Sequence, residues 1–277
     1  MLSGTYIELE AETKGNKAQS DLLTMHLAEI GFESFTEENQ QFQAYMPIES
    51  FDEVHVRKLM ASEFVGLHYT IKEIAAQNWN AAWEAGFEPV EVNEHCVIRA
   101  PFHSPFNDSR LELIIEPRMS FGTGHHATTR LICSKMYGYD FENKRVLDMG
   151  CGTGVLGILA AKRGASSVEG IDIEQWSAEN AAENAAMNGV DMQCFAGDAR
   201  LLAGKQFDVI LANINRNVLV ADAAVYASVL SSGGLIFLSG FLKTDEPVIA
   251  NCFEALDFES CDTASEADWL CLIFRKK

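Results

Sequence analysis

A glycine-dense turn between an apolar strand and a helix constrains this chain more than any other feature. Residues 146–149 are predicted to end a buried strand, the turn 150–154 has the sequence Gly-Cys-Gly-Thr-Gly, and a helix is predicted from Val155. Glycines at alternate positions let the backbone turn sharply and lie against a ligand where a Cβ would clash. The pattern predicts an α/β fold that binds a nucleoside at this turn; the alternative is a plain strand–helix connection.

A carboxylate at the end of the next predicted strand favours nucleoside binding. Residues 167–173 form an apolar run that contains Asp172 near its end. In that position a carboxylate can accept hydrogen bonds from both ribose hydroxyls. The alternative is a solvated turn residue before the helix that starts near Glu174. The G-x-G-x-G spacing resembles the nucleoside loop of S-adenosylmethionine-dependent methyltransferases, which changes the expected chemistry from hydride transfer to methyl transfer.

The C-terminal part of the chain alternates strands and helices. Strands are predicted at residues 146–149, 167–173, 193–196, 207–213, 234–240 and 269–274, and helices at 175–188 and 248–256. Continuous apolar strands between helices indicate a parallel sheet covered on both faces. Ligands of such sheets bind beyond the carboxyl ends of the strands. Gly150, Asp172, Asp198 and Asn213 all fall at those ends.

The first 75 residues follow a different order, β-α-β-β-α-β. Strands are predicted at residues 5–10, 33–36, 42–46 and 67–71, and helices at 19–30 and 54–64. This is the split βαβ pattern of ferredoxin-like domains. Ser50, with Glu53 three residues on, predicts a capping box for the second helix. We therefore expect a ferredoxin-like domain at 1–75, a linker with a helix at 76–90, and a second domain at 91–277 that begins with short strands.

Composition limits the possible partners and the cellular location. The formal net charge is −19, and a surface this acidic repels phosphate backbones. Direct binding of nucleic acid is disfavoured and a basic protein partner is favoured; the alternative is a charge that serves solubility alone. Residues 1–75 hold 13 acidic and 5 basic residues, so this domain is predicted to hold the partner, with a structural appendage as the alternative.

The chain has no apolar run of membrane-spanning length and no secretion signal at its start, so no membrane association is expected. Seven cysteines without a C-x-x-C pair predict reduced thiols in the cytoplasm. No coiled-coil pattern or large apolar stripe favours assembly, so we expect a monomer.

A second glycine-rich segment precedes the sheet. Residues 119–130 have the sequence Met-Ser-Phe-Gly-Thr-Gly-His-His-Ala-Thr-Thr-Arg and lead into a predicted helix with Thr128 or Thr129 near its start. A hydroxyl and free N–H groups there can bind the carboxylate of a methionine moiety. The adjacent His125 and His126 would point apart on a regular helix, and no other ligand follows at metal-binding spacing, so no metal is predicted.

Together these motifs resemble the bacterial ribosomal protein L11 methyltransferases. The matching runs are F-G-T-G-H-H-x-T-T-R at 121–130, L-D-x-G-C-G-T-G at 147–154, G-I-D-I at 170–173 and A-N-I at 212–214. The resemblance covers essentially the whole chain. It implies an N-terminal ferredoxin-like recognition domain, a linker helix and a C-terminal seven-stranded Rossmann-like domain. It also implies S-adenosylmethionine as cofactor, and methylation of lysine side chains and the N-terminal α-amino group of the basic ribosomal protein L11.

The resemblance implies that Thr129, Gly150, Asp172 and Asn213 contact the cofactor. From the glycine turn we also predict Gly152 as a cofactor-binding residue. Asp198 is predicted to approach the adenine amino group, with an exposed turn acid as the alternative. As the catalytic residue, Asn213 is expected to accept a hydrogen bond from the amine and orient it; the alternative is a strand-end turn residue.

The residues after Asn213 distinguish between possible targets. Amide and adenine N-methyltransferases carry a segment close to Asn-Pro-Pro-Tyr, whereas this chain has Asn-Ile-Asn-Arg at 213–216. The missing proline and aromatic residues disfavour a planar nitrogen and favour sp³ amines. Two alternatives remain open: a small-molecule or nucleic-acid methyltransferase, and a protein that binds the cofactor without turnover.

Overall fold

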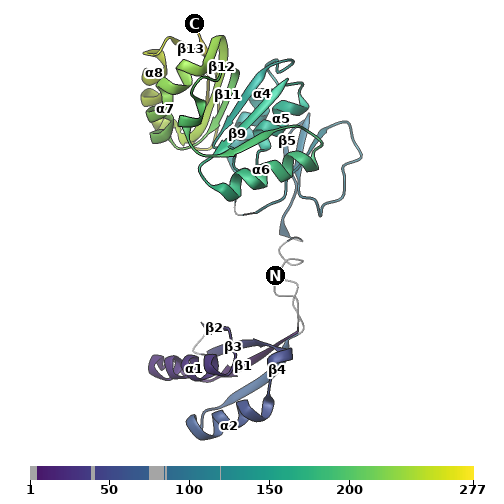
Figure 1. Ribbon diagram of the computed structural model, residues 1–277, viewed down its shortest axis with the longest axis vertical. Helices are drawn as coiled ribbons and strands as arrows, with labels where there is room; N and C mark the ends of the chain where they lie inside the picture. Colours follow the sequence, from purple (N-terminus) through teal and green to yellow (C-terminus); the bar gives the residue numbers. More distant parts are fainter. Residues whose placement is uncertain (1–4, 39–40, 75–83, 85, 119) are drawn as a thin grey trace. The chain divides into compact units, whose positions relative to one another are not determined.

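The computed structural model describes residues 5–38, 41–74, 84, 86–118 and 120–277 (Figure 1). The chain divides into two compact units, Met1–Gly86 and Phe87–Lys277. Of the predicted linker at 76–90, residues 76–83 and 85 lie outside the described residues. Each unit has a sheet and a hydrophobic core of its own.

The N-terminal unit contains one antiparallel sheet. Its elements are β1 (Tyr6–Ala11), α1 (Lys17–Glu29), β2 (Ser34–Glu38), β3 (Gln41–Pro47), the 3₁₀ turn η1 (Ile48–Ser50), α2 (Glu53–Glu63) and β4 (Tyr69–Ile74). The strand order is β2-β3-β1-β4, and every pairing is antiparallel. Leu9 and Phe42 of the sheet share a core with Leu27 of α1 and Met60 of α2. The predicted ferredoxin-like fold is confirmed.

The start of helix α2 differs from the prediction. Ser50 lies in η1, where the N–H of Phe51 donates to the carbonyl of Ile48 over 3.1 Å and closes the turn. The helix therefore begins later, with Asp52 as its N-cap; the Asp52 side chain accepts a hydrogen bond from the N–H of His55 over 3.1 Å. Aspartate caps a helix as well as serine does. The capping box predicted at Ser50 is wrong.

The C-terminal unit contains a seven-stranded sheet and a three-stranded one. Its elements are β5 (Val90–Asn93), β6 (Cys96–Arg99), β7 (Leu111–Ile114), α4 (Ala127–Met136), β8 (Arg145–Met149), α5 (Val155–Lys162), β9 (Ser167–Asp172), α6 (Gln175–Met187), β10 (Gln193–Ala196), η2 (Ala199–Leu202), β11 (Phe207–Asn213), α7 (Arg216–Val229), β12 (Leu230–Leu242), η3 (Lys243–Asp245), α8 (Glu246–Glu254), β13 (Phe258–Glu266) and β14 (Trp269–Lys276). The large sheet has the order β10-β9-β8-β11-β12-β14-β13. Its first five strands run parallel, and β14 runs antiparallel to both neighbours.

Helices cover both faces of the large sheet (Figure 1). On one face, Val146 and Val209 of the strands pack with α4, α5 and α6. On the other face, Leu147 and Ile210 pack with α7 and α8. Neighbouring residues of one strand therefore serve opposite cores, which explains why the strands read as continuous apolar runs. The predicted seven-stranded Rossmann-like sheet is confirmed.

Strand β13 was not located from the sequence. It lies at the edge of the sheet and pairs with β14 alone. Only Phe258 of its nine residues is buried, so most of its side chains are exposed or half-buried. A polar edge strand of this kind lacks the apolar run that marks central strands.

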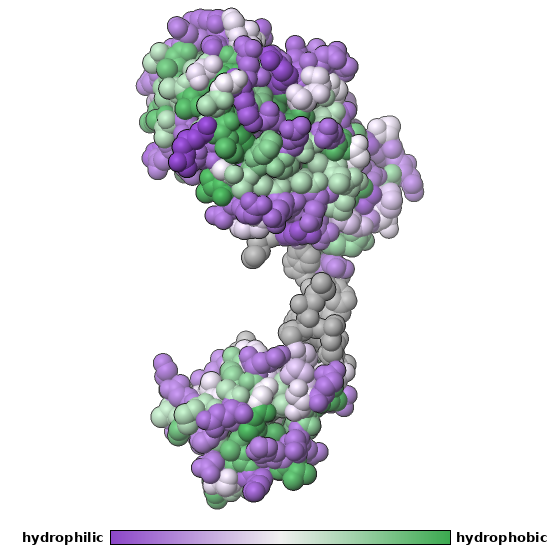
Figure 2. Space-filling model, in the orientation of Figure 1, coloured by the Kyte–Doolittle hydropathy of each residue, from purple (hydrophilic) through white to green (hydrophobic). Residues whose placement is uncertain are grey.

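Hydrophilic residues are spread over the visible face of both units (Figure 2). Within the described part of the chain, no helix is both long and apolar enough to cross a membrane.

Candidate functional site

The glycine turn, residues 150–154, adopts a backbone that requires glycine. Gly150, Gly152 and Gly154 have φ values of 68°, 54° and 79°. A Cβ on Gly150 would lie 2.1 Å from Cγ2 of Ile214, and one on Gly152 would lie 2.2 Å from the carbonyl oxygen of Phe121. Both the left-handed conformation and the lack of space exclude other residues. The turn is thus a closely fitted cradle at the carboxyl end of β8.

Asp172 lies against this turn, at the end of β9. Its Oδ2 accepts a hydrogen bond from the N–H of Gly152 over 2.9 Å, and its Oδ1 accepts one from the N–H of Glu174 over 3.0 Å. The N–H groups of Gly150 and Cys151 both donate to the carbonyl of Ile171. A carboxylate has about four acceptor positions. Asp172 therefore fixes the turn and keeps acceptor capacity for a ligand's hydroxyl groups.

Asn213 and Thr129 meet at the end of β11. The Asn213 amide N–H donates to the Thr129 hydroxyl over 3.4 Å. Thr129 is fully buried at the start of α4. The Oδ1 atom of Asn213 is buried and has no hydrogen-bond partner within the described residues. A buried acceptor without a donor is costly, so this atom points to a donor supplied by a ligand.

The second glycine-rich segment, residues 120–126, is called the histidine loop below, and it interlocks with the glycine turn. The carbonyl of Phe121 accepts a hydrogen bond from the N–H of Thr153 over 2.9 Å. The carbonyl of Gly122 accepts one from the Thr153 hydroxyl over 2.7 Å. Thr153 is fully buried between the two segments. The sequence predicted a binding role for each segment separately. In the structure, hydrogen bonds from Thr153 join the two segments into one site.

The two adjacent histidines have structural partners. His126 is the N-cap of α4; its Nδ1 accepts from the N–H of Thr128 over 3.4 Å, and its ring packs 4.6 Å from that of Trp269. His125 contacts the Thr123 hydroxyl and the carbonyl of Glu88. Among the residues the structure describes, no group of three His, Cys, Asp or Glu side chains is arranged to hold a metal ion.

Asp198 follows β10 at the same edge of the sheet. The N–H of Gly197 donates to the carbonyl of Asp172 over 2.8 Å, which ties this turn to β9. The Arg200 guanidinium bonds both carboxylate oxygens of Asp198 and holds the pKa of that carboxyl below its usual value. Asp198 also caps η2. In this structure the carboxylate pairs with Arg200, and its predicted approach to the adenine amino group stays a prediction.

Asp148 is a site residue that the sequence analysis did not single out. It is 1% exposed, beneath the glycine turn. Its Oδ2 accepts a hydrogen bond from the N–H of Gly157 over 2.8 Å, while its Oδ1 has no partner among the described groups. Burial raises the pKa of Asp148 to about 7; the nearby charge of Asp172 adds to this, and the Gly157 N–H opposes it. The sequence did contain a signal for Asp148: an acidic residue inside an apolar strand, just before the glycine turn.

Two asparagines on α6 and a third at its C-cap were also missed. Asn180, Asn184 and Asn188 lie on one face of the helix and are at most 9% exposed. Asn184 accepts from the N–H of Glu116 and donates to the carbonyl of Thr153, both over 2.9 Å. Asn180 donates to the Ser120 hydroxyl, and Asn188 bonds the backbone of β7. Their four-residue spacing was the signal, since such residues share a helix face. They hold the chain that leads into the histidine loop.

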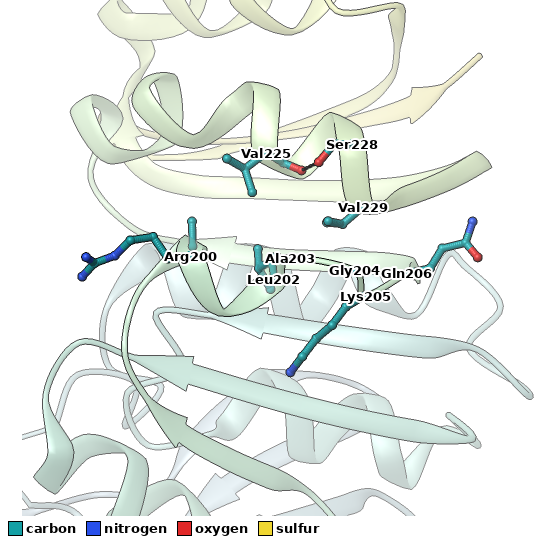
Figure 3. Close-up of a pocket in the computed structure, with 10 residues that line it drawn as sticks. Arg200, Leu202, Ala203, Gly204, Lys205, Gln206, Val225, Ser228 and Val229 are labelled. Atoms are coloured by element: carbon teal, nitrogen blue, oxygen red, sulfur yellow. Dashed lines mark hydrogen bonds between the residues drawn. The ribbon is translucent and has the colours of Figure 1, made fainter.

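A surface hollow between η2 and α7 is separate from these groups. Its lining includes none of the predicted cofactor residues. Figure 3 shows Val225, Ser228 and Val229 projecting from α7, while Arg200 and Lys205 extend in different directions. Arg200 pairs with Asp198 and Lys205 with Glu169. No polar groups converge in the hollow, so it offers no alternative active site.

Three features define the methyltransferase class of α/β enzymes. They are the strand order of the large sheet, the glycine turn after β8, and Asp172 at the end of β9. The chain belongs to the ribosomal protein L11 methyltransferase (PrmA) family, whose model matches residues 5–277. This confirms the family predicted from the motifs, and with it an S-adenosylmethionine-dependent methyltransferase.

Relatives match along nearly the whole chain. The ribosomal protein L11 methyltransferase of Porphyromonas gingivalis is 45% identical over 260 residues, which cover 92% of this chain and 90% of the relative. That of Phocaeicola vulgatus is 40% identical over 279 residues, 98% of this chain and 99% of the relative. The crystal structure of the ribosomal protein L11 methylase from Lactobacillus delbrueckii subsp. bulgaricus has a TM-score of 0.64 and 27% identity, and the match covers 69% of this chain and 100% of that one.

Proposed function

We propose that this protein transfers methyl groups from S-adenosylmethionine to amines of ribosomal protein L11, namely lysine side chains and the N-terminal α-amino group. The names of the relatives support this substrate. The observation that carries the proposal is the buried, unpartnered Oδ1 of Asn213 beside Thr129 and the carboxyl ends of the strands. This acceptor suits the N–H of an amine.

The residues at the sheet edge fit this cofactor. The glycine turn provides a cradle that any Cβ would fill, and Asp172 would accept hydrogen bonds from ribose hydroxyls. Thr129, at the start of α4, would lie near the methionine carboxylate, which suits the N–H groups of a helix start. When bound, the cofactor supplies a methyl group already activated by the positive sulfonium. The protein therefore mainly has to align the amine.

The amine must also be neutral before it can attack. Holding a lysine neutral at pH 7 costs roughly 4.6 kcal/mol from its reference pKa, and an α-amino group costs about 1 kcal/mol. Partial burial lowers the pKa of a lysine. Asn213 Oδ1 would accept from one amine N–H and direct the lone pair, without removing a proton itself. A strong base is not required by this arrangement.

The N-terminal unit is proposed to recognise the basic substrate protein. Along β1, Ile7 and Leu9 face the core, so Glu8 and Glu10 lie on the opposite face of the sheet, where their side chains are 16% and 21% exposed. Lys72 lies 3.9 Å from Glu8 and 3.5 Å from Glu10 and neutralises them only in part. In this proposal residues 1–75 form the recognition domain, 76–90 the linker and 91–277 the methyltransferase domain.

A methyl-transfer assay tests the reaction and the substrate together. Labelled S-adenosylmethionine is supplied with separated ribosomal proteins from a strain that lacks this gene. We expect one labelled band, with modification mapped by mass spectrometry to lysines and the N-terminus of protein L11. Label on rRNA, or on no protein, would refute the proposed substrate.

Two variants assign roles within this reaction. Asn213→Ala should reduce turnover at least about 100-fold, the scale for losing a positioning contact at a reacting group, whereas Asn251→Ala, on the exposed face of α8, should leave it unchanged.

The double variant Glu8→Gln and Glu10→Gln tests the recognition face. It should raise KM for the protein substrate without changing affinity for the cofactor. An unchanged KM would remove the recognition role of this face.

A further inference from the structure

Two histidines bind consecutive backbone carbonyls where the C-terminal unit begins. His103 Nε2 contacts the carbonyl oxygen of Phe87, and His125 Nε2 lies 3.0 Å from that of Glu88. Phe87 is the first residue of this unit. The two histidines come from different segments: His103 follows β6, and His125 belongs to the histidine loop. Residues 87 and 88 are called the joining segment below.

The hydrogen-bond partners of His103 determine which of its ring nitrogens donates. The N–H of Ala100 donates to His103 Nδ1 over 3.1 Å, so that nitrogen must keep its lone pair. A carbonyl oxygen only accepts, so Nε2 must carry the proton and donate to Phe87. The ring is held in place because Arg99, 7% exposed, donates to the carbonyls of Ala100 and His103. This side of the joining segment is therefore rigidly supported.

His125 connects the joining segment with the histidine loop. Its Nε2 donates to the Glu88 carbonyl, and its Nδ1 lies 3.1 Å from the Thr123 hydroxyl. Its ring centre lies 4.5 Å from that of Phe87. From the other side of the loop, Arg130 donates to the carbonyls of Gly124 and His125. The middle of the loop is thus held between the joining segment and α4.

We propose that His103 and His125 form a clamp on the joining segment, with His125 as a positioning residue for cofactor binding. The ends of the histidine loop are fixed by Asn180, Thr153 and the start of α4. Side-chain contacts of His125 and Arg130 hold its middle. Release of His125 frees the middle of the loop, which loosens Phe121 and Gly122 against the glycine turn.

Three variants of the full-length chain isolate the clamp. His125→Phe keeps a ring against Phe87 and removes both ring-nitrogen contacts. His125→Gln keeps an N–H donor of similar reach to Glu88. His95→Phe is the matched control, because His95 is exposed and stacks on Tyr137, 5.2 Å away, in a contact that phenylalanine preserves. Affinity for S-adenosylmethionine is measured by calorimetry, KM and kcat by steady-state assay, and Tm by thermal unfolding.

His125→Phe is expected to weaken cofactor affinity about threefold to tenfold, the scale of one lost hydrogen bond. The KM for S-adenosylmethionine should rise with it, while kcat at saturation and Tm stay close to those of the parent chain. His125→Gln should bind within about twofold of the parent, and His95→Phe should match it. A purely structural role would lower Tm and kcat as well. Unchanged affinity in His125→Phe, or equal losses in the Phe and Gln variants, overturns the clamp.

Discussion

The two glycine-rich segments of the site are held in opposite ways. In the glycine turn, positive φ angles and close approach to Ile214 and the Phe121 carbonyl leave room for glycine alone. Gly122 and Gly124 of the histidine loop also have positive φ angles and little space for a Cβ, but side-chain hydrogen bonds from several elements hold this loop as well. The turn thus depends mainly on its backbone conformation and close packing, whereas the loop depends in addition on side-chain hydrogen bonds from Thr153, His125 and Arg130.

Because of this difference, substitutions in the turn should act through steric clash, and substitutions at the loop should act through lost hydrogen bonds. Thr153 belongs to the turn and bonds the loop twice, so each segment depends on the other at that point. Variants that act by clash should cause the largest losses, since displaced backbone has no alternative position. Variants that remove one hydrogen bond should cause graded losses.

The largest effect is expected from Gly152→Ala. The new Cβ would lie 2.2 Å from the Phe121 carbonyl oxygen, which is backbone and cannot move away without displacing the histidine loop. A φ of 54° adds about 1 kcal/mol of strain for alanine. We expect no measurable cofactor binding by calorimetry. Gly204→Ala is the control, because Gly204 has a φ of 78° and open space around it, so it carries the strain without the clash. Normal binding by Gly152→Ala would show that the turn is not fitted as described.

Asp172→Ala should have the next largest effect. The variant removes the acceptor of the Gly152 N–H and the carboxylate proposed to bind the ribose. We expect at least about a 100-fold loss of cofactor affinity, since hydrogen bonds to charged groups contribute about 1.5–3 kcal/mol each. Asp172→Asn keeps one acceptor and should lose less. Equal affinity of the alanine variant and the parent in calorimetry would place the nucleoside elsewhere.

The same contrast explains what the sequence could predict. The glycine turn and Asp172 were predictable because their spacing follows from a strand–turn–helix geometry that needs no distant partner. Asn184 and Thr153 were not, because their partners, Glu116 and Gly122, lie in separate segments of the chain. The fold was predictable where strands are buried on both faces, and β13 was missed because it is a polar edge strand.

A pH series on Asp148→Asn should show a smaller effect on stability. The pKa of Asp148 is about 7 in the folded chain, above its ordinary value, because of burial. Between about pH 4 and 7 the folded state keeps this proton and the unfolded state has lost it, so the contribution to stability falls as pH rises. The whole change is at most on the order of 4 kcal/mol. Urea unfolding should therefore show Asp148→Asn gaining stability relative to the parent over this window.

A constant difference across the pH series would contradict the raised pKa of Asp148. Asp198→Asn provides a control of opposite sign, since Arg200 holds the pKa of Asp198 below its ordinary value. The stability that this exposed pair contributes is present above the ordinary pKa and is lost as pH falls.

Thr153→Val should have the smallest effect and tests the interlock most directly. Valine has nearly the shape of threonine, so it removes the hydroxyl that donates to the Gly122 carbonyl while keeping the packing and the backbone bond to Phe121. The buried carbonyl left without its donor should cost about 1–2 kcal/mol in the free energy of unfolding. Thr263→Val is the matched control, because the Thr263 hydroxyl bonds the Cys271 carbonyl at an exposed edge strand. If the loop depends on side chains, Thr153→Val will also speed hydrogen exchange of the N–H of residue 153, which donates to the Phe121 carbonyl of the loop, while leaving the N–H groups of residues 150–152 protected. Equal loss of protection at residue 153 and at residues 150–152 would show that turn and loop open as one unit, and the contrast between them would then fail.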